Sequence, residues 1–208
     1  MNIIKFLLID LALAVAIIPL LFLLKGGNKN SLLLRRSNKE ELLRKTSIKI
    51  PDKEKFIELE ELAKKQGSGI KFDSIMGDWK FLSVWKKDID EEDPFFSSLL
   101  RVFSASLKLK KDISTDNSPN FPLIASIEFG FLTIEFSGSG YLTGKQPLLA
   151  FFLNLIELKS GSNVLLSRPL KEPEEKDNSF FSMIALEENG AWLSARGQGG
   201  ALVIWLKD

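Results

Sequence analysis

The stretch IEFGFLTIEF, residues 127–136, has a rhythm that indicates β-structure. Its apolar residues stand at 127, 129 and 131 and then at 132, 134 and 136, so a period of two is interrupted once, beside Gly130. A period of two is typical of strands, whose successive side chains point to opposite faces. Because a slip of one residue exchanges the two faces, we expect a bulge or a turn at Gly130.

The same period continues on the N-terminal side of this stretch. Phe103, Ala105, Leu107 and Leu109 alternate with serine and lysine, which predicts a half-buried strand. On the C-terminal side, residues 148–158 are almost continuously apolar. That run fits either a strand or a buried helix, and we predict a strand.

Further short strands complete the second half of the chain. Two prolines and six charged residues besides Arg168 make residues 168–178 an expected exposed loop. The glycine-rich residues 197–200 predict a hairpin. Seven to nine short strands without interleaved helices indicate a mainly β fold, an antiparallel barrel or sandwich. The remaining strands are expected at 164–167, 180–186, 191–196 and 201–206.

Two short helices are expected before the strands. Ser37-Asn38-Lys39-Glu40 has the spacing of a capping box, which predicts a helix toward Lys45. A second, amphipathic helix should start at Pro51-Asp52 and run to about Gln66. It is expected either to lie on the domain as a lid or to bind a partner. Its apolar stripe is Phe56, Leu59, Leu62 and Ala63.

The N-terminal residues 6–24 read FLLIDLALAVAIIPLLFLL and carry one charge, Asp10. Nineteen helical residues rise about 28 Å, which matches a bilayer core of about 30 Å. We therefore predict an uncleaved transmembrane helix, with a cleaved signal peptide as the alternative, although no small-residue cleavage signature follows the run. The expected organisation is an anchor (1–25), a basic juxtamembrane linker (26–51) and a β-barrel domain (52–208).

Basic residues follow the apolar run. Eight cations stand between residues 25 and 49 against two glutamates, whereas only Lys5 and the α-amine precede the run. Since basic flanks stay on the cytoplasmic side, we expect a single-pass protein with a cytoplasmic C-terminal domain. The cations either bind anionic lipid headgroups or serve only as the topology signal. Those nearest the run are Lys25, Lys29, Arg35 and Arg36.

Composition excludes several classes of protein. A net charge of +1 argues against nucleic-acid binding, which needs a basic excess. The chain has no Cys and no His, so it lacks the usual general base, the thiol nucleophile and the commonest metal ligands. No cofactor or metal is therefore predicted, and an enzyme is not expected. A carboxylate pair, Glu128 with Glu135, is the remaining catalytic candidate if both were to point inward, but both are expected to face water.

A family resemblance rests on the two ends of the domain. Gly77-Asp78-Trp79 is similar to the Gly-x-Trp start of lipocalins, and the segment 191–204, AWLSARGQGGALVI, is similar to the closing Arg-Gly turn and apolar last strand of the plastid lipid-associated proteins, or fibrillins. The resemblance covers about residues 52–206. It departs where the family has Leu-Leu-Tyr-Thr-Ser after the Trp, because this chain has FLSVW at 81–85. The acidic-Leu-Arg element before the turn is also replaced, by GAWL at residues 190–193.

The resemblance implies a lipocalin-like barrel that associates with thylakoid or other lipid structures and binds a lipid, quinone or carotenoid. Gly77, Trp79, Arg196 and Gly197 are then structural signature residues. Arg196 is expected to lie across the Trp79 indole as a cation–π contact that closes the barrel.

Candidate contacts to an apolar ligand are inward-facing apolar residues, for which the alternative is an ordinary place in the core. Eight strands closed on themselves hold one small ligand or are filled by their own side chains. The leading hypothesis is therefore non-enzymatic binding of an apolar small molecule or lipid at a membrane. The alternative is an interaction module for a membrane protein complex, with a filled barrel. The candidate contacts are Phe103, Leu107, Phe129, Phe151 and Leu153.

Overall fold

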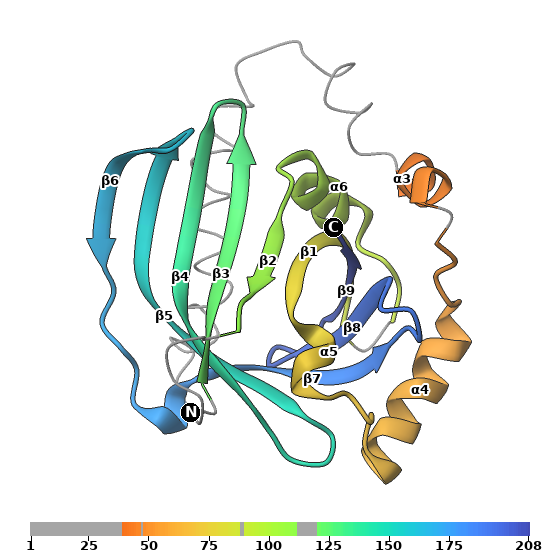
Figure 1. Cartoon of the computed structure of the whole chain (residues 1–208). Helices are drawn as coiled ribbons and strands as arrows, with labels where there is room; N and C mark the ends of the chain where they lie inside the picture. The colour runs from red at the N-terminus through yellow and green to blue at the C-terminus, as the bar shows by residue number, and fades with distance from the viewer. Residues whose placement is uncertain (1–38, 47, 88–89, 112–119) are drawn as a thin grey trace.

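The computed structural model of the protein describes residues 39–46, 48–87, 90–111 and 120–208. Within the described residues, three helices precede the first strand and a fourth follows it, and the remaining strands come in one series after that helix (Figure 1). The elements are α3 (Lys39–Thr46), α4 (Lys53–Gln66), α5 (Phe72–Ile75), β1 (Gly77–Trp85), α6 (Pro94–Val102), β2 (Ser106–Leu109), β3 (Asn120–Phe129), β4 (Leu132–Thr143), β5 (Leu148–Ser160), β6 (Asn163–Pro169), the 3₁₀ turn η1 (Glu175–Asp177), β7 (Ser179–Leu186), β8 (Trp192–Gly197) and β9 (Leu202–Lys207).

Eight of the strands close into an antiparallel barrel. The order β4-β3-β2-β1-β9-β8-β7-β5 returns to its start through a pairing of β4 with β5, and β6 joins only the outer part of β5. Closure satisfies the backbone groups that would otherwise lie along two free sheet edges. The predicted mainly β antiparallel barrel is confirmed.

The ring of strands is closed over only part of its height. β7 pairs with β5 over four residues, Leu148 to Phe151, and β2 accompanies β3 only as far as Ser126. Beyond these points the chain forms a four-stranded sheet of residues 127–129, 132–137, 155–160 and 163–169. We call this extension of β3, β4, β5 and β6 the projecting sheet; Figure 1 shows its strands side by side.

The interior of the closed part is filled by the chain itself. Trp79, Phe121 and Leu193 are at most 1% exposed there, together with Leu123, Leu149 and Met183. Burying one such side chain contributes about 1.5–3 kcal/mol. A second cluster lies outside the barrel wall, between α4 and the strands β1, β7, β8 and β9, with Phe56 and Trp192 at its centre.

Helix α4 forms where the sequence predicts it. The Asp52 side chain accepts a hydrogen bond from the Lys55 backbone N–H, and the helix ends at Gly67, whose φ of +91° suits glycine. Phe56 and Ala63 are buried against the wall, as expected, but Leu62 is 46% exposed. The helix is therefore packed on the domain as a lid, and the stripe is narrower than the sequence suggests.

Helix α3 confirms the short helix predicted toward Lys45. Its Leu42 and Leu43, with Ile48 and Ile50, pack on the cluster outside the wall. The last part of the segment expected to be a linker (26–51) therefore belongs to the folded body. Among the described residues, no helix has the length and apolarity that a membrane crossing needs. The predicted anchor, and Lys25, Lys29, Arg35 and Arg36 with it, lie outside the described residues.

Helix α6 was not predicted, and it corrects the expectation of strands without interleaved helices. Asp93 accepts hydrogen bonds from the backbone N–H groups of Phe95 and Phe96, and Pro94 stands at the first helical position. The expected strand from Phe103 to Lys110 is consequently shorter, because Phe103 is the C-cap of α6 and β2 begins at Ser106. In the sequence, Pro94 and the short apolar run that follows it are the features that indicate this helix.

The two other uncertain segments behave as predicted. The slip of period at Gly130 is a turn between β3 and β4, with a φ of +63° at the glycine. Residues 148–158 form a strand, as part of β5. The predicted strands at 164–167, 180–186, 191–196 and 201–206 correspond to β6, β7, β8 and β9.

Candidate functional site

Trp79 is a structural residue of the barrel floor. Its side chain is fully buried, and its indole Nε1 donates a hydrogen bond of 2.7 Å to the Ile75 carbonyl on α5. The short helix α5 is thereby fixed under the start of β1. A cation does lie over the indole, but it is Lys207 on β9, whose Nζ is 4.8 Å from the ring centroid.

Arg196 binds Glu60 of helix α4, whereas it is expected from the sequence to lie across the Trp79 indole. Its guanidinium donates to both carboxylate oxygens of Glu60 on α4, with a 2.8 Å bond from Nε to Oε1, and also to Asp90. A further bond of 2.8 Å reaches the Gly200 carbonyl in the turn between β8 and β9. The arginine thus holds the helix α4 and the closing hairpin together.

The directions of the pKa shifts agree with a close ion pair between Glu60 and Arg196. Burial by itself would raise the pKa of Glu60, but hydrogen bonds and charges of Arg196 and Lys64 outweigh it, so the pKa lies below its ordinary value. Burial would lower the pKa of Arg196, and Glu60 and Asp90 raise it instead. The pair is therefore charged on both sides.

The expected contact between Arg196 and Trp79 is wrong. Trp79 points into the barrel, where it packs with Leu193 and Ala195, whereas Arg196, next along β8, points outward to α4. Successive strand residues face opposite sides of the wall, so a residue adjacent to the inward Ala195 cannot reach an inward indole. Gly77 and Gly197 lie on strands β1 and β8, and Gly77 has a φ of +127°.

The structure separates the five predicted ligand contacts. Leu107 and Phe151 belong to the filled interior, and Leu153 borders it. Phe103 is 3% exposed in a small cluster with Leu99. Only Phe129, which is 40% exposed, lies on the projecting sheet. The five side chains therefore do not line a single cavity.

The projecting sheet carries an apolar face that continues the barrel interior. Phe121 and Leu123 point inward, so Phe129 on the same strand does too, and its pairing partners carry this face across the sheet. Phe136 stands opposite Ala125 and Ile156, and Leu158 stands opposite Leu166. We call this set the inner apolar face: Ile127, Phe129, Leu132, Ile134, Phe136, Ile156, Leu158 and Leu166.

The described apolar clusters reach only one margin of the inner apolar face, and the central residues of the face are half-buried. Phe103 lies against Phe129, with ring centroids 5.7 Å apart, and Ile127 joins the cluster of Leu99 and Phe103. None of the three apolar clusters formed by described residues includes Ile134, Phe136, Ile156 or Leu158. Large apolar side chains at the rim are exposed: Phe131 by 77% and Leu166 by 63%.

One cation belongs to this face. Arg168 on β6 stands opposite the inward Ile156, so it lies on the same side of the sheet. It is exposed and, within the described part of the chain, forms no ion pair or hydrogen bond through its side chain. Within the described residues, the face thus combines apolar side chains with a guanidinium that has no polar partner there, and such a guanidinium can bind an anionic group.

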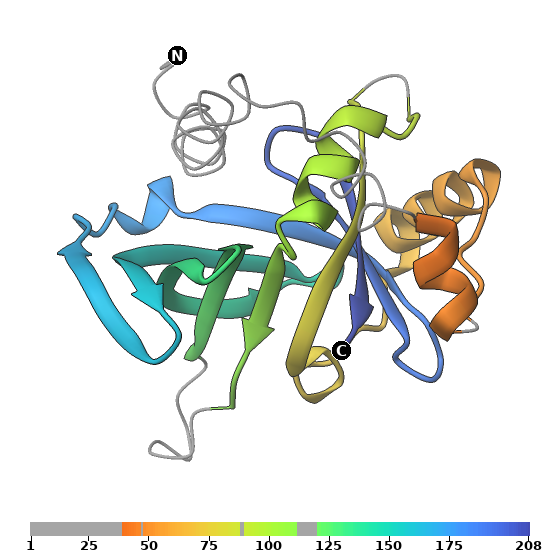
Figure 2. The same cartoon turned by 90° about the horizontal axis from the view of Figure 1, so that it is seen from above.

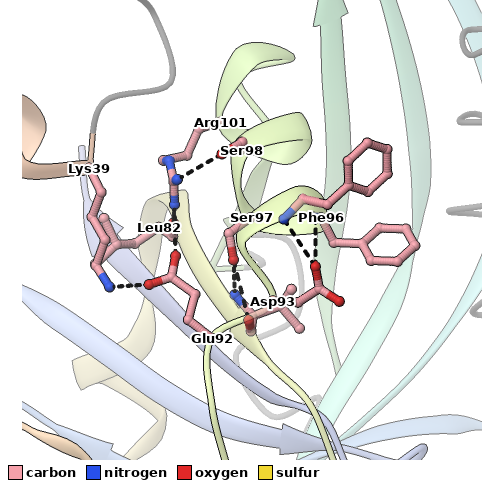
Figure 3. A network of polar contacts seen from close by, with 10 residues as sticks. Lys39, Leu82, Glu92, Asp93, Phe96, Ser97, Ser98 and Arg101 are labelled. Atoms are coloured by element: carbon pink, nitrogen blue, oxygen red, sulfur yellow. Dashed lines mark hydrogen bonds and ion pairs between the residues drawn. The ribbon is translucent and has the colours of Figure 1, made fainter. Parts of the chain in front are cut away.

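Polar contacts hold α6 at the margin of the face. Arg101 donates to the Leu82 carbonyl on β1 (2.6 Å) and to Glu92, and Lys39 of α3 also binds Glu92, as Figure 3 shows. The Ser97 hydroxyl bridges the backbone N–H and carbonyl of Val84. Figure 2 shows α6 standing over the barrel between β1 and the projecting sheet. The helix therefore has a fixed position, and its C-terminal end meets β3.

The outer side of the projecting sheet is polar. Glu135 binds Lys159 at 2.7 Å, and hydrogen bonds to Glu135 and Glu157 raise the pKa of that lysine. Glu128 lies on the same outer side and is exposed. The two carboxylates considered for acid–base chemistry thus both point away from the interior, as expected.

A pocket of about 240 Å³ lies on the outer wall, between β4, β5 and the loop before β7. Tyr141 and Phe152 line it together with Glu172 and Glu175, so its rim is acidic and open to solvent. It does not adjoin the inner apolar face, because Tyr141 and Phe152 point outward. No group of acidic residues in the described ranges has the arrangement of a metal site.

The sequence pattern could have located the inner apolar face. The apolar positions 132, 134 and 136 already stood in register with 127 and 129 across the Gly130 turn. The pattern does not contain the length over which the ring of strands is closed, and this length decides which inward-facing residues belong to the buried core.

No protein-family model, curated protein or solved structure matches the chain.

Proposed function

We propose that the protein binds an apolar, lipid-like molecule with an anionic end on the inner apolar face of the projecting sheet, without chemical conversion. The observation that carries this proposal is the inner apolar face, whose central residues lie outside every apolar cluster of the described residues: Ile134, Phe136, Ile156 and Leu158. An apolar patch of this kind on a soluble surface marks an interaction or ligand site. Because side chains fill the interior of the closed part, the proposed binding site lies on the projecting sheet and not at the centre of the barrel.

The proposal includes the membrane. The apolar run 6–24 and the cations after it support a single membrane anchor with the barrel on the cytoplasmic side, and lipid is then the molecule at hand. A short helix before a Gly-x-Trp strand and a closed barrel support kinship with the fibrillins. By this kinship, the protein would carry or shield a lipid, quinone or carotenoid.

A matched pair of variants tests the binding site. Ile134 faces inward and its neighbour Thr133 faces outward on β4. Ile134→Glu should weaken binding of cis-parinaric acid to the full chain at least ten-fold, because about 1.5–3 kcal/mol of apolar burial is lost and a negative charge is placed against an anionic ligand. Thr133→Glu should change the affinity by less than two-fold.

Mass spectrometry of lipid extracted from the purified full chain gives an independent readout. A defined anionic lipid that is retained by wild type and lost in Ile134→Glu would support the proposal. Absence of both a retained lipid and fluorescent-probe binding in the wild-type chain would refute it.

A second function is favoured by the free edge of β6. Every residue of this strand is exposed, including Val164, Leu165 and Leu166, and within the described residues β6 pairs only with β5. A free apolar edge accepts a further strand from another protein. Crosslinking in intact membranes through position Leu165 should then give one defined protein neighbour, whereas a carrier gives none.

A further inference from the structure

The pocket on the outer wall is separate from the inner apolar face and has an aromatic floor. Its volume is about 240 Å³, and it lies between β4, β5 and the loop of residues 170–178. Tyr141 and Phe152 line it, and they point outward because their neighbours Gly140 and Phe151 face the interior. The floor of the pocket therefore consists of two rings on the outer side of the barrel.

The two rings are diagonal neighbours. Tyr141 pairs with Ala150 and Phe152 pairs with Ser139, so the rings stand on one face of adjacent strands, offset by two positions. Such diagonal neighbours lie about 7–8 Å apart, which leaves room for a small group between their side chains. Within the described residues, neither ring packs against another aromatic ring. Both rings are thus available to a ligand that enters the pocket.

Two carboxylates at the rim supply negative charge. Glu172 accepts one long hydrogen bond of 3.5 Å from the Asn154 amide, and the Glu175 side chain has no polar partner among the described residues. The lysine next to Glu175 in the loop, Lys176, pairs instead with Glu174. No cation of the described chain therefore neutralises either carboxylate of the rim.

The loop that carries these carboxylates is held in place by backbone hydrogen bonds. The Leu170 N–H donates to the Asn154 carbonyl of β5 at 2.8 Å, and the Asp177 N–H donates to the Glu174 carbonyl at 2.7 Å within η1. Pro173 further restricts the chain between these two points. The rim is therefore formed before a ligand arrives, which lowers the cost of binding.

The combination of rings and carboxylates favours one class of ligand. An acidic rim alone attracts any cation, but aromatic faces bind best a cation that lies within about 6 Å of the ring centre, as quaternary ammonium groups do. We propose that the outer-wall pocket binds a methylated ammonium group between Tyr141 and Phe152, with Glu172 and Glu175 as its counter-charge. This site is independent of the function proposed for the inner apolar face. The group belongs either to a free choline-like cation or to a phosphocholine lipid headgroup.

Ligand-observed NMR titrations of the full chain, in an uncharged maltoside detergent at constant ionic strength, test the class of ligand. Choline should bind saturably. Its analogue 3,3-dimethyl-1-butanol has the same shape without the charge, and ethanolamine has the charge without the methyl groups. Each analogue should bind at least about five-fold more weakly, because each lacks one of the two features that the pocket recognises. Absence of saturable choline binding, or equal affinity for choline and either analogue, would overturn the proposal.

Variants locate the bound cation. Glu175→Gln should weaken choline binding about three- to five-fold, whereas Glu188→Gln, which removes the same charge from the exposed turn between β7 and β8, should change it by less than about two-fold. Phe152→Leu keeps an apolar side chain and should weaken binding about five-fold through the loss of one ring. Near-ultraviolet circular dichroism verifies that each variant is folded. Equal choline affinities of wild type, Glu175→Gln and Phe152→Leu would overturn the placement in this pocket.

Two further titrations identify the source of the group and separate the two sites. Tighter binding of choline than of phosphocholine supports a free cation, and the reverse order supports a lipid headgroup. Ile134→Glu alters the opposite side of the sheet and should leave the choline affinity unchanged while it weakens binding of cis-parinaric acid. Loss of both ligands in folded Ile134→Glu would overturn the existence of a separate cation site. Choline binding without any binding of cis-parinaric acid to wild type would support this site and count against the function proposed above.

Discussion

Glu60 on α4 and Arg196 on β8 form a bidentate ion pair on the outer side of the barrel wall, although they lie 136 positions apart in the chain. Asp90 and the Gly200 carbonyl complete the shell of the guanidinium. This one arginine therefore joins the first helix of the barrel domain to its closing hairpin.

The first prediction concerns this pair. Glu60→Gln should lower the free energy of unfolding by about 2–3 kcal/mol, because Arg196 then keeps a largely desolvated charge without its main partner. Glu58→Gln breaks the exposed pair with Lys55 and should cost less than about 0.5 kcal/mol. Urea unfolding of both variants makes the comparison. Equal effects of the two variants would contradict a special role for Arg196.

The second prediction is a pH dependence. The folded-state pKa of Glu60 lies below the ordinary value of 4.5, so its contribution to stability is complete above pH 4.5 and is lost as the pH falls through the folded-state pKa. The stability difference between wild type and Glu60→Gln should be constant from about pH 6 to 8 and should shrink in more acidic solution. Urea midpoints measured both in this range and below pH 4.5 provide the measurement, and a difference that grows on acidification would be inconsistent with the lowered pKa.

A third prediction separates Arg196 from Trp79. Because the two side chains lie on opposite sides of the wall, Trp79→Phe and Arg196→Ala should destabilise additively, within about 0.5 kcal/mol. Arg196→Ala combined with Glu60→Ala should instead show a coupling energy of about 1 kcal/mol or more. Double-mutant cycles from urea titrations measure both. A coupling energy between Trp79 and Arg196 clearly above this limit would contradict their placement on opposite sides of the wall and would support the cation–π contact expected from the sequence.

A fourth prediction concerns the bulge where β4 crosses β5. A Cβ at Gly138 would lie 1.9 Å from the Phe152 carbonyl oxygen, which is backbone and cannot turn away. Gly138→Ala should therefore shift the strands apart and cost about 3 kcal/mol or more. Ser139→Ala, next along the same strand, should cost less than about 1 kcal/mol. Thermal unfolding with near-ultraviolet circular dichroism compares the two, and a neutral Gly138→Ala would rule out this close approach.

A fifth prediction uses two fully buried serines. The Ser83 hydroxyl has no hydrogen-bond partner among the described residues, whereas that of Ser194 donates to the Ala185 carbonyl at 3.3 Å. Ser83→Ala should be neutral or stabilising by up to about 1 kcal/mol, since it removes an unsatisfied polar group. Ser194→Ala should destabilise by about 1 kcal/mol. The same sign of change for both variants would count against the difference in bonding.

The local elements could be predicted from the sequence because their causes are local. Asp52 and Gly67 bound a helix by their own hydrogen bonding and conformation, and Gly130 turns the chain between two apolar alternations. The lid helix, the β3–β4 hairpin and the closing hairpin followed from such signals. Helix α6 was missed because nine residues give too short a run for a period to stand out.

The candidate site depended on distances that no local pattern contains. Phe129 and Phe151 alternate alike in the sequence, yet Phe151 is 8% exposed in the filled interior and Phe129 is 40% exposed on the projecting sheet. The difference arises from where β7 leaves β5 and where β2 leaves β3. Similarly, the outward direction of Arg196 followed from the register of β8 between its neighbours.

The sequence alone determined that this chain alternates in β-strands, that its helices begin and end at particular caps, and that its inward residues are apolar. These are properties of neighbouring residues and of the two-residue repeat of an extended backbone. Tertiary structure alone decided which partner each strand takes, how far the ring stays closed, and hence which apolar residues are core and which are left as a face. Pairing joins residues far apart in the chain, so its register is an outcome of packing the whole barrel at once.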